Sequence, residues 1–373
     1  MKMIIFHAFH SLGSGTLLLQ VLLLHYCYLS GLAENLYSLD DTWSPSFPIG
    51  SHTFSAVGVA RDRLFVTQRG NATLDPVVVL STSSGRAIAS WGSQTVALAT
   101  AGTWGAHGLS VERCANECSP GDPLPRIRVW IEDFTNHTVT SYSSMGKKYE
   151  QTGTPGVAGN GTDPIQFGNV ADAVVVGGET TIVYASDGDG GHANRVVKIS
   201  LEREGGTTWD DTIVKTVWVT GHIFDNPHSI TLHEQSGLLV VADREHQALK
   251  LLQAATGTML GTWDCPDLPF GNEYGVPFGV RALRFRGRDL IFVASMDNPQ
   301  DHRFQKISVI DASNLSAEAS TKSPCTLVQT LKIDPDMYSG PHLLGVDPAT
   351  GDVYAALVAD APKSTVLRFR LDK

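Results

Sequence analysis

The sequence predicts an all-β protein, a six-bladed β-propeller, and three observations lead to this fold class. A pattern of apolar strand, polar turn and second apolar strand occurs six times, with starts 52, 64, 57, 53 and 61 residues apart. The predicted strands are short, rich in β-branched residues and separated by Gly, Pro, Asp and Asn. No convincing amphipathic helix follows the first 33 residues. Four-stranded units repeated at about 40–60 residues are typical of propellers, so six units predict six blades.

Each predicted unit shows two or more of its strands in the sequence. The units begin at Ser55, His107, Ala171, His228, Arg281 and His342. A third apolar strand follows most of them, and a fourth is visible in two units, which end at Trp91 and Trp263. An eight-stranded barrel or a sandwich would not give six similar units. We therefore predict one propeller domain, residues 34–373, in which residues 34 to about 50 complete the last blade.

The composition favours a folded protein without a nucleic-acid partner. With 42% hydrophobic and 18% charged residues, the chain can bury a core. The formal net charge is −10, and no basic stripe alternates with aromatic residues. Such a chain lacks the electrostatic pattern that binds phosphate backbones.

The first 33 residues have the pattern of a secretory signal peptide, with an apolar run over residues 16–29 and a plausible cleavage point after Ala33. The alternative is a signal anchor that stays in the membrane. The run is short for a membrane span and contains Gln20 and His25, which favours cleavage. We therefore expect a secreted or secretory-pathway protein with no membrane span after cleavage.

Four cysteines remain after the predicted cleavage, and an even number in a secreted chain favours disulfides. Cys114 and Cys118 flank a polar loop and are the likelier pair, which leaves Cys265 for Cys325. A zinc site that uses Cys114 and Cys118 is the weaker alternative, because no second pair has suitable spacing. Four glycosylation sequons fit an exposed glycoprotein surface; they lie at Asn71, Asn136, Asn160 and Asn314.

Three histidines share one position of the repeat in alternate units. His107, His228 and His342 begin units two, four and six, and they are 121 and 114 residues apart. The first strand of each blade lines the channel of a propeller, so these three imidazoles should meet on its axis. Three nitrogen ligands with a free position are typical of an open zinc site. The alternative is a metal-free polar plug. The same register places Ser55, Ala171 and Arg281 in the intervening blades.

Two arginines stand where the second strand of a unit ends, Arg69 in unit one and Arg244 in unit four. These units lie opposite each other in a six-bladed ring, so both guanidiniums could face one cavity. Guanidinium is the preferred partner of a carboxylate, because its planar fork binds both oxygens. The alternative is two unrelated surface arginines.

The stretches PHSITL and VVADREH, together with VTQRG and GPHLLGVDPATGDVYAAL, resemble the peptidylamidoglycolate lyase module of peptidyl-glycine α-amidating enzymes. That family is a six-bladed propeller of NHL-type repeats, and the resemblance covers residues 50–372. It implies that His107, His228 and His342 bind zinc and that Arg69 and Arg244 bind substrate. The implied reaction splits a peptidyl-α-hydroxyglycine into an amidated peptide and glyoxylate. A separate hydroxylating monooxygenase is then an implied partner.

The sequence departs from this family at three positions. Asp189 stands in SDGDGGH where the family has a tyrosine that serves as base, so Asp189 or His192 would have to replace it. Gly340 replaces an expected methionine, and Leu343 replaces an acidic calcium ligand, which weakens the case for calcium. The departures keep a second hypothesis open, that of a catalytically inactive propeller that binds a ligand or a protein. A calcium-dependent hydrolase is disfavoured, because such propellers hold the metal with Asn, Asp and Glu.

Overall fold

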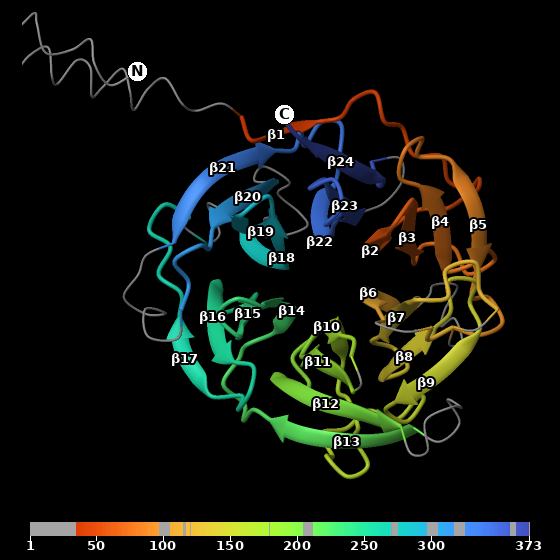
Figure 1. The fold of residues 1–373 in the computed structure, drawn as a ribbon, viewed down its shortest axis with the longest axis vertical. Coiled ribbons are helices and arrows are strands. Elements are labelled where there is room, and N and C mark those ends of the chain that lie inside the picture. Colours follow the sequence, from red (N-terminus) through yellow and green to blue (C-terminus); the bar gives the residue numbers. More distant parts are fainter. Residues whose placement is uncertain are drawn as a thin grey trace, which may run out of the picture. The chain divides into compact units, whose positions relative to one another are not determined.

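Each of the six predicted units folds as one antiparallel sheet of four strands, and the sheets are arranged in a ring (Figure 1). The structure is a computed structural model that describes residues 35–96, 105–114, 117–119, 121–178, 180–203, 212–268, 270, 275–296, 305–316, 325–358 and 363–372. The predicted signal peptide, residues 1–33, lies outside the described residues. The predicted six-bladed β-propeller is confirmed.

The strands of each blade follow one another in chain order from the channel outward. Blade 1 contains β2 (Phe54–Ala60), β3 (Arg63–Gln68), β4 (Val77–Ser81) and β5 (Ala87–Trp91). Blade 2 contains β6 (Ala106–Arg113), β7 (Ile127–Asp133), β8 (Thr138–Tyr142) and β9 (Lys148–Thr152). Blade 3 contains β10 (Val170–Val176), β11 (Thr181–Asp187), β12 (Arg195–Arg203) and β13 (Thr212–Val219).

The second half of the ring repeats this arrangement. Blade 4 contains β14 (Pro227–His233), β15 (Leu238–Asp243), β16 (Ala248–Gln253) and β17 (Met259–Thr262). Blade 5 contains β18 (Val276–Phe285), β19 (Arg288–Met296), β20 (Lys306–Asp311) and β21 (Thr326–Lys332). Blade 6 contains β22 (Gly340–Val346), β23 (Val353–Val358), β24 (Val366–Leu371) and, as its outer strand, β1 (Tyr37–Leu39).

The ring closes where β1 pairs with β24, so the two ends of the domain share blade 6 (Figure 1). This confirms the predicted role of the segment before blade 1. Tyr37 also joins blade 6 to blade 5, because its backbone exchanges two hydrogen bonds of 2.8 and 2.7 Å with the side chain of Gln329. Its ring is buried and meets Phe292 edge-to-face at 5.4 Å.

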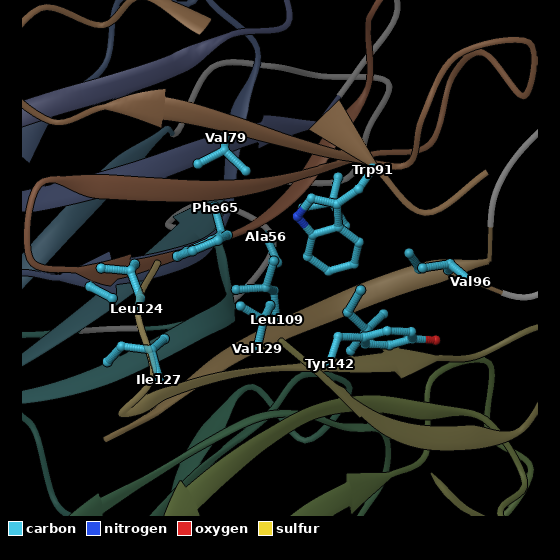
Figure 2. Close-up of a cluster of buried hydrophobic side chains, with 14 of the residues drawn as sticks. Ala56, Phe65, Val79, Trp91, Val96, Leu109, Leu124, Ile127, Val129 and Tyr142 are labelled. Atoms are coloured by element: carbon cyan, nitrogen blue, oxygen red, sulfur yellow. The ribbon is translucent and has the colours of Figure 1, made fainter. Parts of the chain in front are cut away.

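Apolar side chains between the faces of neighbouring blades form the core. Figure 2 shows the cluster between blades 1 and 2, in which Phe65 of β3, Leu109 of β6 and Val129 of β7 are fully buried. The blades approach closely at Gly58 of β2, where an added Cβ would overlap the side chains of Leu109 and Val111. Burial of these apolar faces is the main favourable term of the fold.

The first strand of every blade begins with a β-bulge, and the bulges set which side chain points into the channel. The bulged residues are Ser55, His107, Ala171, His228 and Phe278, with His342 and Leu343 in blade 6. A bulge inserts an extra residue and turns its side chain out of the regular alternation. Five of the six predicted channel positions are confirmed. The prediction of Arg281 is wrong, because Phe278 holds that position and Arg281 pairs regularly with Phe292, three residues further along β18.

Both predicted disulfides are present. Cys114–Cys118 lies in the insertion of blade 2, and Cys265–Cys325 joins the segment after β17 of blade 4 to the residue before β21 of blade 5. The first pairing means that Cys114 and Cys118 do not form the alternative zinc site. All four sequon asparagines are exposed or half-buried. In the described part of the chain, no helix has the length and apolar character needed to cross a membrane.

We predict that Tyr37→Ala lowers the free energy of unfolding by about 3–5 kcal/mol, because it removes a buried aromatic ring at the ring closure. Leu39→Ala, on the same strand at 39% exposure, should change it by less than about 0.5 kcal/mol. Urea unfolding monitored by tryptophan fluorescence measures both. Equal effects of the two substitutions would contradict a closing role for Tyr37.

Candidate metal centre

The three predicted histidines lie together at one end of the channel. His107 comes from β6, His228 from β14 and His342 from β22, and their ring centroids are 4.7–5.0 Å apart. One ligand atom from each lies within 4.8 Å of those of the other two, and all three side chains are buried. The bulges of alternate blades therefore bring together residues separated by more than a hundred positions in the chain.

Each histidine is oriented by the backbone of the next blade. The Nδ1 atoms of His107, His228 and His342 lie 2.7, 2.8 and 2.7 Å from the carbonyl oxygens of three bulged residues, which are Ala171, Phe278 and Ser55. A carbonyl oxygen only accepts, so each Nδ1 carries a proton and donates it. The Nε2 lone pair of each neutral ring is then available as a ligand.

The residues fit a metal. The Nε2 atom of His228 is buried and has no hydrogen-bond partner among the described residues, although buried polar atoms are nearly always paired. Burial lowers the pKa of His228 and His342 well below the usual histidine range, and neighbouring positive charges lower it further. Both rings are therefore neutral, which is the form that coordinates metal. Three imidazole nitrogens suit zinc.

Both predicted arginines lie beside the trio, each stacked on a phenylalanine. The guanidinium of Arg69 lies 4.5 Å from the ring centre of Phe134, and that of Arg244 lies 5.1 Å from that of Phe278. These two rings lie 5.8 Å from His107 and 5.0 Å from His228, respectively. Arg69 and Arg244 follow β3 and β15 at equivalent positions, as the sequence predicts.

Asp189 belongs to the same site, and its loop holds it there. The backbone N–H of Asp189 donates to the carbonyl of Asn169 at 3.0 Å, and the Asn169 side chain donates to the carbonyl of Asp189 at 2.7 Å. Its carboxylate lies 3.2 Å from Nε2 of His107 and 3.3 Å from Arg244. His192, the other residue considered as a base, is exposed.

The surroundings of Asp189 favour its ionised form. Burial opposes the charge, but Arg244, and His107 when its Nε2 carries a proton, hold the pKa of Asp189 below its usual range. The carboxylate of Asp189 also acts on Arg69. Burial lowers the pKa of the Arg69 guanidinium, and the negative charges of Asp189 and Asp133 offset part of this effect. One anionic side chain thus lies beside His107 of the candidate metal centre and beside Arg244 of the arginine pair.

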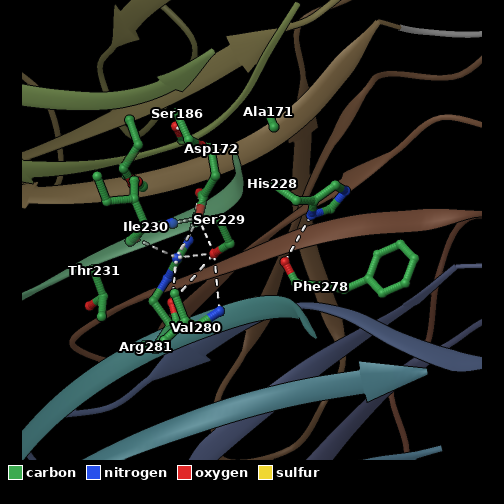
Figure 3. A network of polar contacts seen from close by, with 12 residues as sticks. Ala171, Asp172, Ser186, His228, Ser229, Ile230, Thr231, Phe278, Val280 and Arg281 are labelled. Atoms are coloured by element: carbon green, nitrogen blue, oxygen red, sulfur yellow. Dashed lines mark hydrogen bonds and ion pairs between the residues drawn. The ribbon is translucent and has the colours of Figure 1, made fainter. Parts of the chain in front are cut away.

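A second polar layer lies below the trio (Figure 3). Arg281 donates two hydrogen bonds, of 2.6 and 2.8 Å, to the carboxylate of Asp172, which also accepts one from Ser229 at 2.6 Å. Beyond Arg281, residues further along the six inner strands line a cavity of about 430 Å³. None of the three histidines lines this cavity.

The structure gives context to two departures from the lyase family. A Cβ atom added at Gly340 would overlap the Sδ atom of Met296. The side chain of Met296, from β19, therefore occupies the space that the first side-chain carbon of a methionine at position 340 would need. Leu343 is fully buried in the apolar cluster of blades 1 and 2. The side chain of Leu343 has no oxygen that could replace the acidic calcium ligand of that family.

Sequence reasoning missed Phe134, Phe278, Asn169 and Glu132. A signal for Phe278 was present, because a proline precedes the bulged residue in blades 4, 5 and 6, in the sequences PH, PF and PH. Alignment on these prolines would have selected Phe278 instead of Arg281. No local signal points to the other three, since their role depends on contacts between blades.

The fold and the site together define a class of protein, a six-bladed β-propeller with three histidines that converge in its channel. No protein-family model matches the sequence. The chain is 30% identical over 371 residues to NHL repeat-containing protein 3 of Mus musculus, with 92% of each chain covered. It is 29% identical over 333 residues to the protein of the same name from Homo sapiens, covering 86% of this chain and 81% of that one. The chain belongs to the family of NHL repeat-containing protein 3.

A solved structure supports the fold independently. The PQQ-bound aldose sugar dehydrogenase of Streptomyces coelicolor matches with a TM-score of 0.53 over 90% of this chain and 98% of that chain. The two sequences are 10% identical, so the likeness concerns the fold alone. The comparisons establish an NHL-repeat propeller, and the lyase activity is a proposal.

The buried carboxyl group of Glu132 in β7 should make the stability of the protein depend on pH. The side chain is fully buried, and neither carboxylate oxygen has a hydrogen-bond partner among the described residues. Burial and the negative charge of Asp172 raise its pKa well above the usual range, while Arg281 opposes them. The folded state therefore keeps a proton that the unfolded chain releases above about pH 4.3. Stability is lost as pH rises from there through the folded pKa.

We predict that Glu132→Gln, which cannot lose a proton, makes the melting temperature less dependent on pH. The variant should gain stability over the wild type at pH 8 and gain little at pH 5. Thermal unfolding followed by circular dichroism at the two pH values measures this. An identical pH profile for variant and wild type would show that Glu132 does not hold the proton.

Proposed function

We propose that the protein is a zinc-dependent, peptidylamidoglycolate lyase-like enzyme. His107, His228 and His342 would hold the zinc ion, and Arg69 and Arg244 would bind the terminal carboxylate of a peptidyl-α-hydroxyglycine. The convergence of three Nε2 atoms beside two guanidiniums carries this proposal. A metal ligand set and a carboxylate-binding pair then face one substrate end.

The roles of the side chains follow from their chemistry. When bound, zinc would supply Lewis-acid chemistry that lowers the pKa of a coordinating hydroxyl. Arg69 and Arg244 would fix the carboxylate and the charge that develops beside it. Asp189 would accept the hydroxyl proton and would then donate it to the amide nitrogen as the C–N bond breaks. The products are an amidated peptide and glyoxylate, with no net change of protons.

A second function, carboxylate binding without turnover, is favoured by the state of Asp189. A carboxylate whose pKa is held below its usual range is a weak base at neutral pH. The tyrosine of the lyase family is a much stronger base when ionised. In this case the propeller would capture a carboxylate-bearing ligand at the same residues.

We place this activity in the secretory pathway, on the basis of the predicted signal peptide, the two disulfides and the four sequons. The substrate needs a hydroxylated glycine at its end. A separate hydroxylating monooxygenase would therefore act before this protein.

We predict that the purified mature chain contains about one zinc ion and that His228→Ala loses it, because the substitution removes one of the three imidazole ligands on which the site is built. His222→Ala, at an exposed histidine, should keep the metal. Elemental analysis of the dialysed proteins gives the stoichiometry. Equal zinc contents in wild type and His228→Ala would remove the metal site from the proposal.

We predict zinc-dependent release of glyoxylate from a peptidyl-α-hydroxyglycine. Arg244→Lys should lower kcat/KM by about tenfold to a hundredfold, the effect of losing a charge-assisted hydrogen bond. Arg284→Lys, at a 65% exposed side chain, should leave it unchanged. No glyoxylate from the zinc-loaded wild type, together with measurable binding of the substrate, would support the binding function instead.

A further inference from the structure

Asp189 and His107 face each other with two atoms that would both accept a hydrogen bond. Nδ1 of His107 donates to the carbonyl of Ala171 at 2.7 Å, so a neutral ring has no proton on Nε2. The carboxylate oxygen Oδ2 of Asp189 lies 3.2 Å from this Nε2. Two acceptors at this distance repel each other unless a cation, either a proton or a metal ion, lies between them.

The distance suits two ligands of one metal ion. Ligands of a tetrahedral zinc ion with bonds of about 2.1 Å lie roughly 3.4 Å apart. The 3.2 Å between Oδ2 of Asp189 and Nε2 of His107 is close to this value. His107 is in turn one of the three histidines whose ligand atoms lie within 4.8 Å of one another. Carboxylate oxygen is an ordinary fourth partner for three imidazoles.

The loop after β11 directs the carboxylate of Asp189 inward. Backbone and side-chain hydrogen bonds with Asn169 hold both polar groups of its peptide, as described above. Gly188 packs against Pro227, the residue before His228, and leaves no room for a side chain there. An aspartate in a solvated turn would have neither restraint. Only 19% of the Asp189 side chain is exposed.

The second oxygen of Asp189 engages the proposed substrate-binding residue. Oδ1 lies 3.3 Å from the guanidinium of Arg244, so the carboxylate bridges the histidine cluster and one member of the arginine pair. A substrate carboxylate, as proposed above, would need the same guanidinium. Asp189 thus occupies the place of a carboxylate ligand.

We infer that Asp189 is the fourth protein ligand of the metal and that an incoming carboxylate competes with it for Arg244. This inference rests on the metal site of the proposed function. It assigns a resting site with four protein ligands, whereas three histidines alone would leave one position open. Access of a ligand then depends on the release of Asp189.

The test compares zinc and cobalt binding in the wild type and Asp189→Asn, with Asp62→Asn as the control. Asp62→Asn is the same chemical change in a turn, where the side chain of Asp62 is 71% exposed. Zinc affinity is measured by competition with a chelator, and the visible spectrum of the cobalt-loaded protein reports its ligands. We expect Asp189→Asn to bind zinc about tenfold more weakly or worse and to change the cobalt spectrum, while Asp62→Asn matches the wild type.

Acetate serves as a probe of the freed position, in the same proteins. It should alter the cobalt spectrum of Asp189→Asn at concentrations that leave the wild type unchanged, because the wild type supplies its own carboxylate. A wild-type spectrum that responds to acetate as readily as the variant would overturn the inference, even if the variant folds poorly. So would unchanged zinc affinity and an unchanged spectrum in Asp189→Asn.

The result separates this inference from the proposed function. If the wild type binds zinc through His228 and Asp189→Asn behaves like the wild type, only the role of Asp189 is wrong. The carboxylate of Asp189 then lies beside the zinc-bound His107 without binding the metal itself. If the wild type binds no zinc, the metal site and the fourth ligand fail together.

Discussion

The hydrogen bond from each channel histidine to the next blade is the contact on which the centre of the molecule depends. Nδ1 of His107, His228 and His342 donates to a bulge carbonyl in blades 3, 5 and 1, respectively. Each bond joins two neighbouring blades, which also meet through apolar side chains and through other polar contacts, such as the hydrogen bond from Thr181 to Glu112 between blades 3 and 2. The same bond fixes the tautomer and turns Nε2 toward the axis. Assembly of the ring and formation of the candidate metal centre are therefore one event.

Charge is arranged in layers along the channel. Arg69, Arg244 and Asp189 lie beside the histidines, and Asp172 with Arg281 lies on the other side of them. The Asp172–Arg281 pair is buried and bidentate, so it is satisfied internally and does not depend on a ligand. The layer around Asp189 differs, because two acceptor atoms face each other there. The proposed zinc ion would lie between these two atoms, and this would link the fold to the proposed chemistry.

Much of the fold and part of the site could be predicted from the sequence. The repeat predicts six blades because short alternating strands must bury their apolar faces on similar neighbours. The spacing of the histidines predicts their convergence because alternate blades of a six-bladed ring are related by about 120°. The error at Arg281 has a simple physical cause. The first strand of blade 5, β18, begins at Val276, five residues before Arg281, so a register that starts at Arg281 places the channel position three residues too late.

The sequence by itself determined the class of fold and the set of histidines and arginines from which a site could form. These features follow from periodicity and spacing along one chain. Only the tertiary structure decided that Phe278 holds the fifth channel position. It also decided that the guanidiniums of Arg69 and Arg244 stack on Phe134 and Phe278, and that the carboxylate of Asp189 faces His107. Each of these contacts joins different blades. Their geometry depends on bulges and loop hydrogen bonds that no local pattern specifies.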